Sequence, residues 1–347
     1  MSYDPKNPST RYDEADYRAF AGSSLTASLV TPALRFDSVE DASVFFAREL
    51  DYIKSKTYDK VYPQFSALTL FPHTSEIDPG AETATYYAYD KNGMAVIISN
   101  YATDLPRADV HGEPTTVVIK SVGASYGYSV QEMRASRMAG KSLDVRKADA
   151  ARYAIERTMN RIAWAGDAKN KLVGVLSPGN DIPIYIIPAG ASGSTKFADK
   201  TADEILADIN GMVAYVSDLT MDVEKPDSIV FPTDVFLDLT SRRIPDTETT
   251  ILKFLRENSA YIKNFSSAAE LNAKNTETNP YAAAVDGQGV CLLYTKDADK
   301  LCIEEPMAFM QYPAQEKGLE IVVNCESRTA GAMIYFPLSA VIAPGVS

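Results

Sequence analysis

Histidine, cysteine and tryptophan are scarce in this chain of 347 residues, which has two histidines, three cysteines and one tryptophan. His73 and His111 are far apart in the sequence and each lies beside a proline or a glycine, so a metal site or a Ser-His-Asp triad has few candidate residues. The cysteines are odd in number and widely spaced, unlike a zinc or redox motif. Cys291, Cys302 and Cys325 have apolar neighbours and are expected to be buried, reduced thiols.

Long apolar runs are also missing. No segment reaches the ~18 consecutive apolar residues that a membrane helix requires. The nearest candidate, residues 332–346, is interrupted by Pro337 and Pro344. The N-terminal sequence MSYDPKNPSTRYDEAD has no basic stretch followed by an apolar one, so it is not typical of a secretory signal. We therefore expect a soluble protein with no membrane partner.

Motifs for nucleotide binding and covalent catalysis are absent from the sequence. It contains no G-x-G-x-x-G and no G-x-S-x-G, and the loop at residues 190–196 (GASGSTK) has Thr195 where a phosphate-binding loop requires glycine. The 46 acidic residues form many chance pairs, and none of these indicates a site without geometry. The sequence thus gives no positive reason to predict an enzyme, a cofactor or a metal.

The charge balance is acidic, with a formal net charge of −12 at pH 7. This total argues against broad coating of nucleic acid, because binding to the phosphate backbone requires clustered Lys and Arg. Residues 134–161 form one basic island, with eight Lys or Arg against three Asp or Glu. A solvated helix face is the favoured interpretation of this island, and a local contact with nucleic acid is the alternative.

Residues 143–166 (LDVRKADAARYAIERTMNRIAWAG) are predicted to form the longest helix, the spine of the fold. Gly166 is placed to end it in the left-handed conformation that glycine tolerates. At a period of 3.6 residues, one stripe is apolar and consists of Ala148, Ala151, Ile155, Met159 and Ile162. The opposite side carries the basic residues Arg146, Lys147, Arg157 and Arg161.

A hairpin is predicted around residues 90–93 (DKNG), because an Asn-Gly pair between two β-prone runs is a strong turn signal. The tip is expected at residues 91–93, with residues 96–98 opposite the tyrosines of ATYYAY and apolar side chains on both faces. A lone two-stranded ribbon cannot cover both of its faces, so a neighbouring subunit is expected to cover it. An ordinary core hairpin is the alternative. The predicted intersubunit residues are Tyr86, Tyr87, Tyr89, Lys91, Met94, Val96 and Ile98.

Caps and periodicity predict the remaining elements. An amphipathic helix is predicted over residues 38–56, and capping boxes at Ser129 with Glu132 and at Thr201 with Glu204 begin two further helices. The helix–strand–helix order after residue 201 indicates an α/β unit, and the last strands are expected to rejoin the sheet of the first unit. Short helices are predicted over 235–239, 250–258 and 267–272, and strands over 115–128, 227–231, 290–295, 301–304, 308–312, 319–325 and 332–335.

This order of elements resembles the major capsid proteins of tailed bacteriophages, of the Hong Kong 97 type. Local sequences that look like one such capsid family are YYAYDKNGMA, YGYSVQEMRASRMAGKSLDVRKADAARYAIERTMNRIAWAGD and GLEIVVNCESRTAGAMIYFPLSAV. The resemblance extends from about residue 38 to residue 343. It implies an α+β Hong Kong 97-like capsid fold with an N-terminal arm, an extended β-hairpin loop, a peripheral domain with a long spine helix, and an axial α/β domain.

The resemblance also implies domain boundaries. The arm would be residues 1–37, the peripheral domain residues 38–80, 114–176 and 306–347, the extended loop residues 81–113 and the axial domain residues 177–305. Some shells of this type join a loop lysine to an asparagine of a neighbour, with a glutamate as base. Lys91, Asn324 and Glu326 are placed for this, but such residues are too common at turns to predict the bond.

The implied function is that of a major capsid protein, which self-assembles as hexamers and pentamers into the icosahedral head shell around double-stranded DNA. Its expected location is the virion capsid, assembled in the host cytoplasm. Separate scaffolding, portal and decoration proteins are candidate partners, and packaged DNA would contact the basic side of the long helix loosely. An encapsulin-like nanocompartment shell, which shares the fold, is the alternative, and a soluble α/β enzyme is the remote one.

Overall fold

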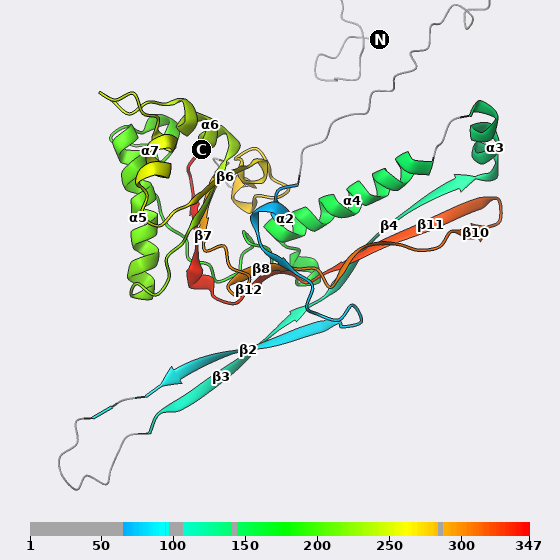
Figure 1. Cartoon of the computed structure of the whole chain (residues 1–347), viewed down its shortest axis with the longest axis horizontal. Coiled ribbons are helices and arrows are strands. Elements are labelled where there is room, and N and C mark those ends of the chain that lie inside the picture. The colour runs from blue at the N-terminus through cyan, green and yellow to red at the C-terminus, as the bar shows by residue number, and fades with distance from the viewer. Residues whose placement is uncertain (1–64, 94, 97–106, 141–143, 284–286) are drawn as a thin grey trace, which may run out of the picture. The chain divides into compact units, whose positions relative to one another are not determined.

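The computed structural model (Figure 1) describes residues 65–347, except residues 94, 97–106, 141–143 and 284–286. The predicted arm and the predicted helix over residues 38–56 lie outside the described residues. Helices and strands are mixed along the described chain, which confirms the predicted α+β class. Its strands form three sheets, in the orders β1-β8-β12, β10-β11-β4 with β9 beside β11, and β13-β7-β5-β6, and one ribbon, β2-β3.

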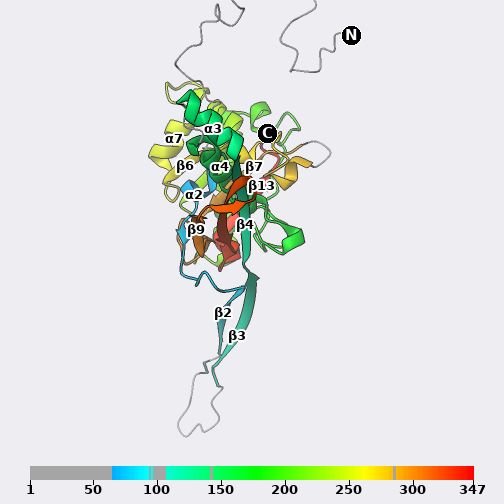
Figure 2. The same cartoon turned by 90° about the vertical axis from the view of Figure 1, so that its right-hand side faces the viewer.

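Helix α4 (Asp144–Ala165) confirms the predicted spine. Its apolar stripe packs on β4 (Lys120–Ser129) and β11 (Glu320–Thr329), and both views of the chain show α4 running beside these strands (Figures 1 and 2). Gly166 follows the helix with φ +70°, and a Cβ there would lie 2.6 Å from the Leu172 carbonyl oxygen. Only glycine therefore fits this helix end. The contact consists of Ala151, Ile155 and Met159 against Tyr126, Tyr128, Val323 and Cys325.

Strand β11 pairs antiparallel with β4 along the length of both strands. On its other edge lie β9 (Met307–Gln311) and β10 (Gln315–Lys317), so these late strands rejoin the earlier part of the chain, as predicted. Helix α3 (Val130–Ala139) begins directly after β4. The predicted capping box is present, because the Ser129 hydroxyl accepts from the Glu132 amide and the Glu132 carboxylate accepts from the Ser129 amide.

The sheet β13-β7-β5-β6 is buried on both faces. Side chains that alternate along its strands enter two different apolar clusters. One face, with Ile229 and Leu293, packs against the helices α5, α6 and α7; the other, with Val230 and Leu292, packs against Trp164 of α4. The bounds are β5 (Ser228–Pro232), β6 (Asn264–Ala268), β7 (Val290–Tyr294), β13 (Ala340–Pro344), α5 (Ala202–Thr220), α6 (Thr233–Ser241) and α7 (Ile251–Asn258).

The C-terminal segment divides among the three sheets. β12 (Gly331–Ile334) pairs with β8 (Leu301–Glu304), which in turn pairs with β1 (His73–Thr74). The last strand, β13, was not predicted. It pairs with β7, so it does not join the sheet of the first unit, where the closing strands were expected. Its sequence AVIAP is buried on both faces and lacks the alternation by which a strand is recognised.

The prediction of a helix over residues 267–272 is wrong in its first part. Residues 264–268 form β6, which pairs parallel with β5, and only Ala269–Leu271 form a 3₁₀ turn. Phe265 and Ala268 are buried in this position. The hydrogen bonds of the sheet and this burial outweigh the local helical preference of a five-residue segment.

The predicted hairpin exists, but its second strand was predicted wrongly. β2 (Thr83–Asn92) pairs antiparallel with β3 (Asp109–Val118), so that Tyr87 lies opposite Pro114 and Asn92 opposite Asp109. Residues 93–108 therefore connect the strands, and the turn predicted at residues 91–93 does not form. A turn signal reports only local preference, whereas the pairing with β3 runs along ten residues of each strand.

All three cysteines are buried and form no disulfide, as predicted. Within the described residues, no helix is long and apolar enough to cross a membrane. The short elements are α2 (Ala67–Leu70), Ala168–Asn170, Phe197–Asp199, Pro280–Ala283 and Pro337–Ser339.

Candidate functional site

The β2–β3 ribbon has two unlike faces. Directly paired residues of an antiparallel pair share a face, so Ala84 and Val117 lie on the same side as Tyr86. This side packs at its root into an apolar cluster with Tyr335 and Cys302. The Tyr86 ring lies 4.9 Å from the Tyr335 ring, and its hydroxyl donates to the Ile334 carbonyl at 3.3 Å. The root of the ribbon is thus part of the core.

The opposite side, here called the tyrosine face, is open to solvent. Tyr87 is 60% exposed and Tyr89 is 70% exposed, and their rings stack at 6.3 Å. Tyr89 covers Gly112, where a Cβ would lie 2.8 Å from the ring. Large, contiguous exposed apolar patches are typical of sites that contact another molecule. The face consists of Thr85, Tyr87, Tyr89, Lys91, Val110, Gly112, Pro114 and Thr116.

The structure separates the predicted intersubunit residues. Tyr87, Tyr89 and Lys91 share the tyrosine face, whereas Tyr86 lies on the other face and packs against its own chain. Val96 is exposed outside any strand. Met94 and Ile98 lie outside the described residues. The interpretation of these residues as an intersubunit contact stays a prediction.

Sequence reasoning missed the contribution of β3 to the tyrosine face. Val110 and Pro114 lie beside the tyrosines, and Val110 is exposed. Residues 115–118 lie within the strand predicted over 115–128, but DVHGEP before them has no clear strand signal, because glycine and proline both disfavour a strand interior. The ribbon has only two strands, so β3 is an edge strand, and proline is tolerated in edge strands.

Lys147 and Arg157, two of the basic residues predicted on α4, pair with carboxylates of their own chain. Lys147 donates to the Gly127 carbonyl at 2.8 Å and to the Glu132 carboxylate at 2.9 Å, and it lies over the Tyr128 ring. The hydrogen bond from Lys147 is the main reason why the pKa of Glu132 is lowered. Arg157 pairs with Glu277 at 2.7 Å. These carboxylates reduce the charge that both residues offer to phosphate.

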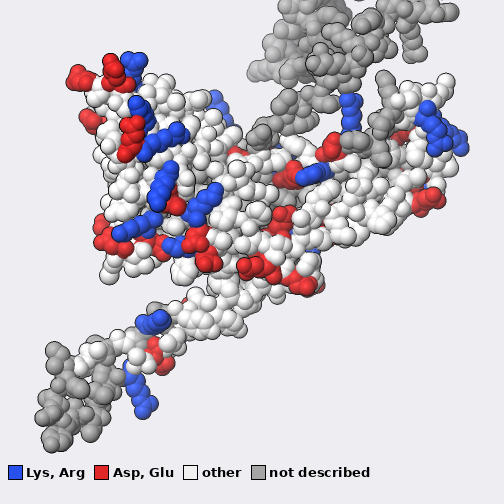
Figure 3. Space-filling view, in the orientation of Figure 1, with Lys and Arg blue, Asp and Glu red and all other residues white. Residues whose placement is uncertain are grey.

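Of the other basic residues predicted on α4, Arg146 is exposed and Arg161 is half-buried. Space-filling Figure 3 shows Lys and Arg interspersed with Asp and Glu over the face in view, rather than in one basic field. A mixed surface binds nucleic acid only weakly. The basic patch therefore stays a prediction of loose contact.

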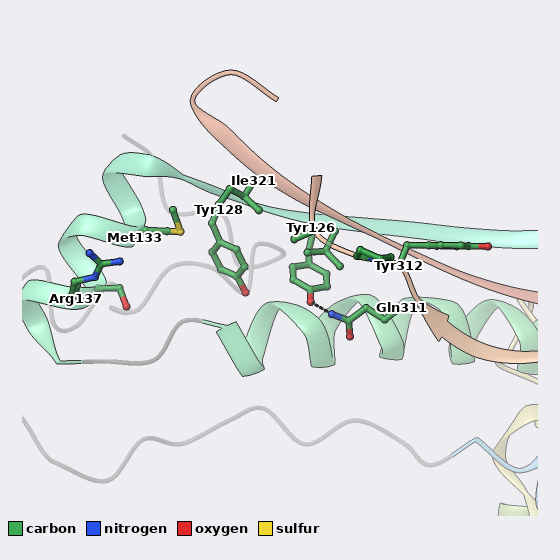
Figure 4. Close-up of a pocket in the computed structure, with 11 residues that line it drawn as sticks. Tyr126, Tyr128, Met133, Arg137, Gln311, Tyr312 and Ile321 are labelled. Atoms are coloured by element: carbon green, nitrogen blue, oxygen red, sulfur yellow. Dashed lines mark hydrogen bonds between the residues drawn. The ribbon is translucent and has the colours of Figure 1, made fainter. Parts of the chain in front are cut away.

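A pocket of about 860 Å³ opens between α3, β4, β9 and β11 (Figure 4). Tyr126 and Tyr128 extend from β4 into the space between the sheet and α4, and Gln311 donates to the Tyr126 hydroxyl at 2.6 Å. At the edge of the pocket Tyr312 donates to Glu326 at 2.7 Å. The lining is mostly aromatic and apolar, with Ser136, Arg137 and Gln311 as its polar members, and it suits packing rather than proton transfer. It consists of Tyr126, Tyr128, Met133, Ser136, Arg137, Gln311, Tyr312, Pro313, Ala314, Ile321 and Val323.

Of the residues considered for a crosslink, Lys91 lies on the ribbon, whereas Asn324 and Glu326 lie on β11. Hydrogen bonds from Ser121 and Tyr312 lower the pKa of Glu326, which keeps this carboxylate ionised. The structure thus brings Asn324 and Glu326 together on one strand, and it does not test the bond.

One family model matches most of this chain. Residues 93–346 match the family described as "Major capsid protein". No curated protein matches the sequence. Among solved structures, the capsid of Myoviridae phage XM1 is similar with a TM-score of 0.73 at 15% identity, covering 88% of this chain and 100% of that one.

Two further solved structures are similar. The capsid of the native GTA particle has a TM-score of 0.61 at 10% identity and covers 90% of this chain and 100% of that one. A structure from Mycobacterium phage Ogopogo has a TM-score of 0.56 at 12% identity and covers 85% and 96%. At these identities the likenesses concern the fold, and they confirm the predicted Hong Kong 97-like architecture.

Proposed function

Because the chain belongs to the major capsid protein family, we propose that it is the shell subunit of a tailed-bacteriophage head, assembled as hexamers and pentamers into an icosahedral container for double-stranded DNA. The single observation that carries the proposed mode of assembly is the tyrosine face. Burial of each large side chain in a contact contributes about 1.5–3 kcal/mol. Tyr87 and Tyr89 are mostly exposed and are available for such a contact. A neighbouring copy is the partner that covers them.

The partners and location follow from this role. The chain binds copies of itself, and separate scaffolding, portal and decoration proteins are its candidate partners during head assembly. The protein is a component of the virion capsid, and assembly takes place in the host cytoplasm. The role is structural, without catalysis. Membership of a capsid family supports this, and no observation favours an encapsulin-like compartment over a phage head.

The domain roles are also part of the proposal. The arm is residues 1–37, the extended loop residues 81–113 and the axial domain residues 177–305. The peripheral domain is residues 38–80, 114–176 and 306–347. The sheet topology supports one refinement. β13 pairs with β7, so residues 340–344 are assigned with the axial domain rather than with the peripheral domain.

Contact with packaged DNA is weak in this account. Lys147 and Arg157 bind carboxylates of their own chain, which reduces the positive charge that they offer to DNA. The net charge of −12 opposes close approach of a phosphate backbone. The DNA is therefore enclosed rather than specifically bound.

Electron microscopy and light scattering of the purified full chain test the proposed function. Over a range of protein and salt concentrations, we expect closed shells of uniform size. A monomer or dimer that persists under all conditions, including with scaffolding protein from the same genome, would contradict the proposal. Shells isolated with protein cargo and no DNA would favour the compartment alternative.

A further inference from the structure

We propose that Glu304 and Arg328 are positioning residues for assembly, which together fix the direction in which the β2–β3 ribbon leaves the three sheets and α4, here called the body. Both lie on body strands, β8 and β11, and neither lies on the ribbon. The inference rests on the proposed function, because the direction of the ribbon matters only if the ribbon must meet a neighbouring copy.

Glu304 holds the beginning of the segment that leads to the ribbon. Its side chain is buried, with the residue 2% exposed. One carboxylate oxygen accepts from the amides of Glu76 at 2.9 Å and Ile77 at 3.1 Å, and the other accepts from the Thr74 hydroxyl. A buried carboxylate that accepts three hydrogen bonds is costly to displace. It therefore fixes the backbone where the chain leaves β1.

Arg328 holds the end of the same segment. Its guanidinium donates to the Pro79 carbonyl and, at 2.9 Å, to the Ala81 carbonyl, two residues before β2 begins. The planar fork of arginine presents several donors in a rigid arrangement, which a lysine cannot reproduce. Glu304 and Arg328 thus hold residues 74–81 at both ends, through backbone groups and the Thr74 hydroxyl.

Apolar packing by itself does not fill the space between the ribbon and the body. A pocket of about 300 Å³ lies between the ribbon and the body, lined on one side by Tyr86, Tyr87 and Ala88 and on the other by residues that include Tyr335 and Phe336. Open space beside a packed contact permits rotation. The charged hydrogen bonds of Glu304 and Arg328 supply the directional constraint that apolar contact does not.

The length of the ribbon amplifies small errors at its root. Tyr86 is packed against the body, and Asn92 lies six residues farther along β2. At about 3.3 Å per residue this distance is about 20 Å, so a rotation of about 10° at the root moves Asn92 by roughly 3.5 Å. A displacement longer than a hydrogen bond separates most contacts of an interface. The tyrosine face therefore meets its partner only if the root is held.

A buried carboxylate elsewhere provides a matched control. Glu270 is buried and accepts from the Ser66 amide and the Asn160 side-chain amide, and it does not contact the segment of residues 74–81. Glu270→Gln and Glu304→Gln make the same chemical change at similar burial. Loss of stability alone would affect assembly equally in both variants.

The experiment measures the ribbon direction and assembly in the full chain. Spin labels at Glu113→Cys on β3 and Lys169→Cys on the body report their distance distribution, since the native cysteines are buried. We expect a single narrow distribution in the parent chain, at least a twofold broadening in Arg328→Ala, and partial recovery in Arg328→Lys. Particles of Arg328→Ala and Glu304→Gln should be mixed in size or reduced in yield at least tenfold, with Glu270→Gln unaffected.

The outcomes separate the two proposals. A narrow distribution with normal particles in Arg328→Ala would overturn the positioning role, as would equal assembly defects in Glu270→Gln and Glu304→Gln at equal unfolding midpoints. Broadening in Arg328→Ala, together with normal shells from a chain that lacks Tyr87 and Tyr89, would uphold the root geometry and contradict the ribbon interface itself.

Discussion

The β13-β7-β5-β6 sheet and the β2–β3 ribbon both contain β-branched and aromatic residues, but they differ in how much of their surface the chain itself covers. All five residues of β7 are buried, and the sheet is covered on both faces by its own chain. Most of β3 is exposed, and Tyr87 and Tyr89 project into solvent. Under the proposed function, the stability of the subunit and its ability to assemble therefore reside in different regions, which substitutions can separate.

The largest effect on stability is expected beside the sheet. Lys200 donates to Asp208 at 2.5 Å and to the Pro188 carbonyl at 2.6 Å, and both charged side chains are buried. Burial raises the pKa of Asp208, and the Lys200 ammonium acts in the opposite direction. Lys200→Met leaves this carboxyl without its cation, so the free energy of unfolding should fall by about 3–5 kcal/mol in urea denaturation.

The control for this variant is Lys196→Met, which changes an exposed lysine four residues earlier in the sequence. Its free energy of unfolding should stay within about 0.5 kcal/mol of the parent. Similar losses of unfolding free energy in the two variants would show that the buried ion pair contributes no more to stability than an exposed lysine does.

A somewhat smaller loss is expected in the core of the sheet. Leu293 is fully buried in β7, and Leu293→Ala removes apolar contact and leaves a cavity. The free energy of unfolding should fall by about 3 kcal/mol. Leu237→Ala changes an exposed leucine of α6 and should have little effect. A loss under about 1 kcal/mol for Leu293→Ala would break the comparison, because the sheet would then tolerate cavities.

An intermediate effect is expected at α3, at the far end of β4. Ser129 caps this helix, so Ser129→Ala should lower stability by about 1 kcal/mol. Hydrogen exchange of the first α3 amides, followed by mass spectrometry, checks this, with Ser129→Thr as the variant that retains a cap. Unchanged exchange in Ser129→Ala would show that the capping box contributes nothing to the helix.

Elements with a local cause were predicted from the sequence. The spine helix depends on its own periodicity and on Gly166, and the capping boxes of α3 and α5 lie within four residues. β5 was recognisable as a short, continuous apolar run. In each case the residues that determine the element are neighbours in sequence.

Three strands that depend on a distant partner, β3, β6 and β13, were not predicted or were predicted only in part. β3 contains Gly112 and Pro114 and becomes a strand because β2 pairs with it, while the Asn92–Gly93 signal pointed to the wrong partner. β6 and β13 are strands because β5 and β7 provide edges for them. The separation of Tyr86 from the tyrosine face follows from the same pairing, which no local pattern encodes.

The most direct test of the central claim combines stability and assembly in one variant, Tyr87→Ser/Tyr89→Ser in the full chain. The free energy of unfolding of the unassembled subunit should stay within about 0.5 kcal/mol of the parent, because these side chains are exposed. Shells should disappear from electron micrographs, while Tyr87→Phe/Tyr89→Phe, which retains the aromatic surface, should still assemble. Normal shells from the serine variant, or a loss of about 2 kcal/mol or more in the isolated subunit, would contradict the account.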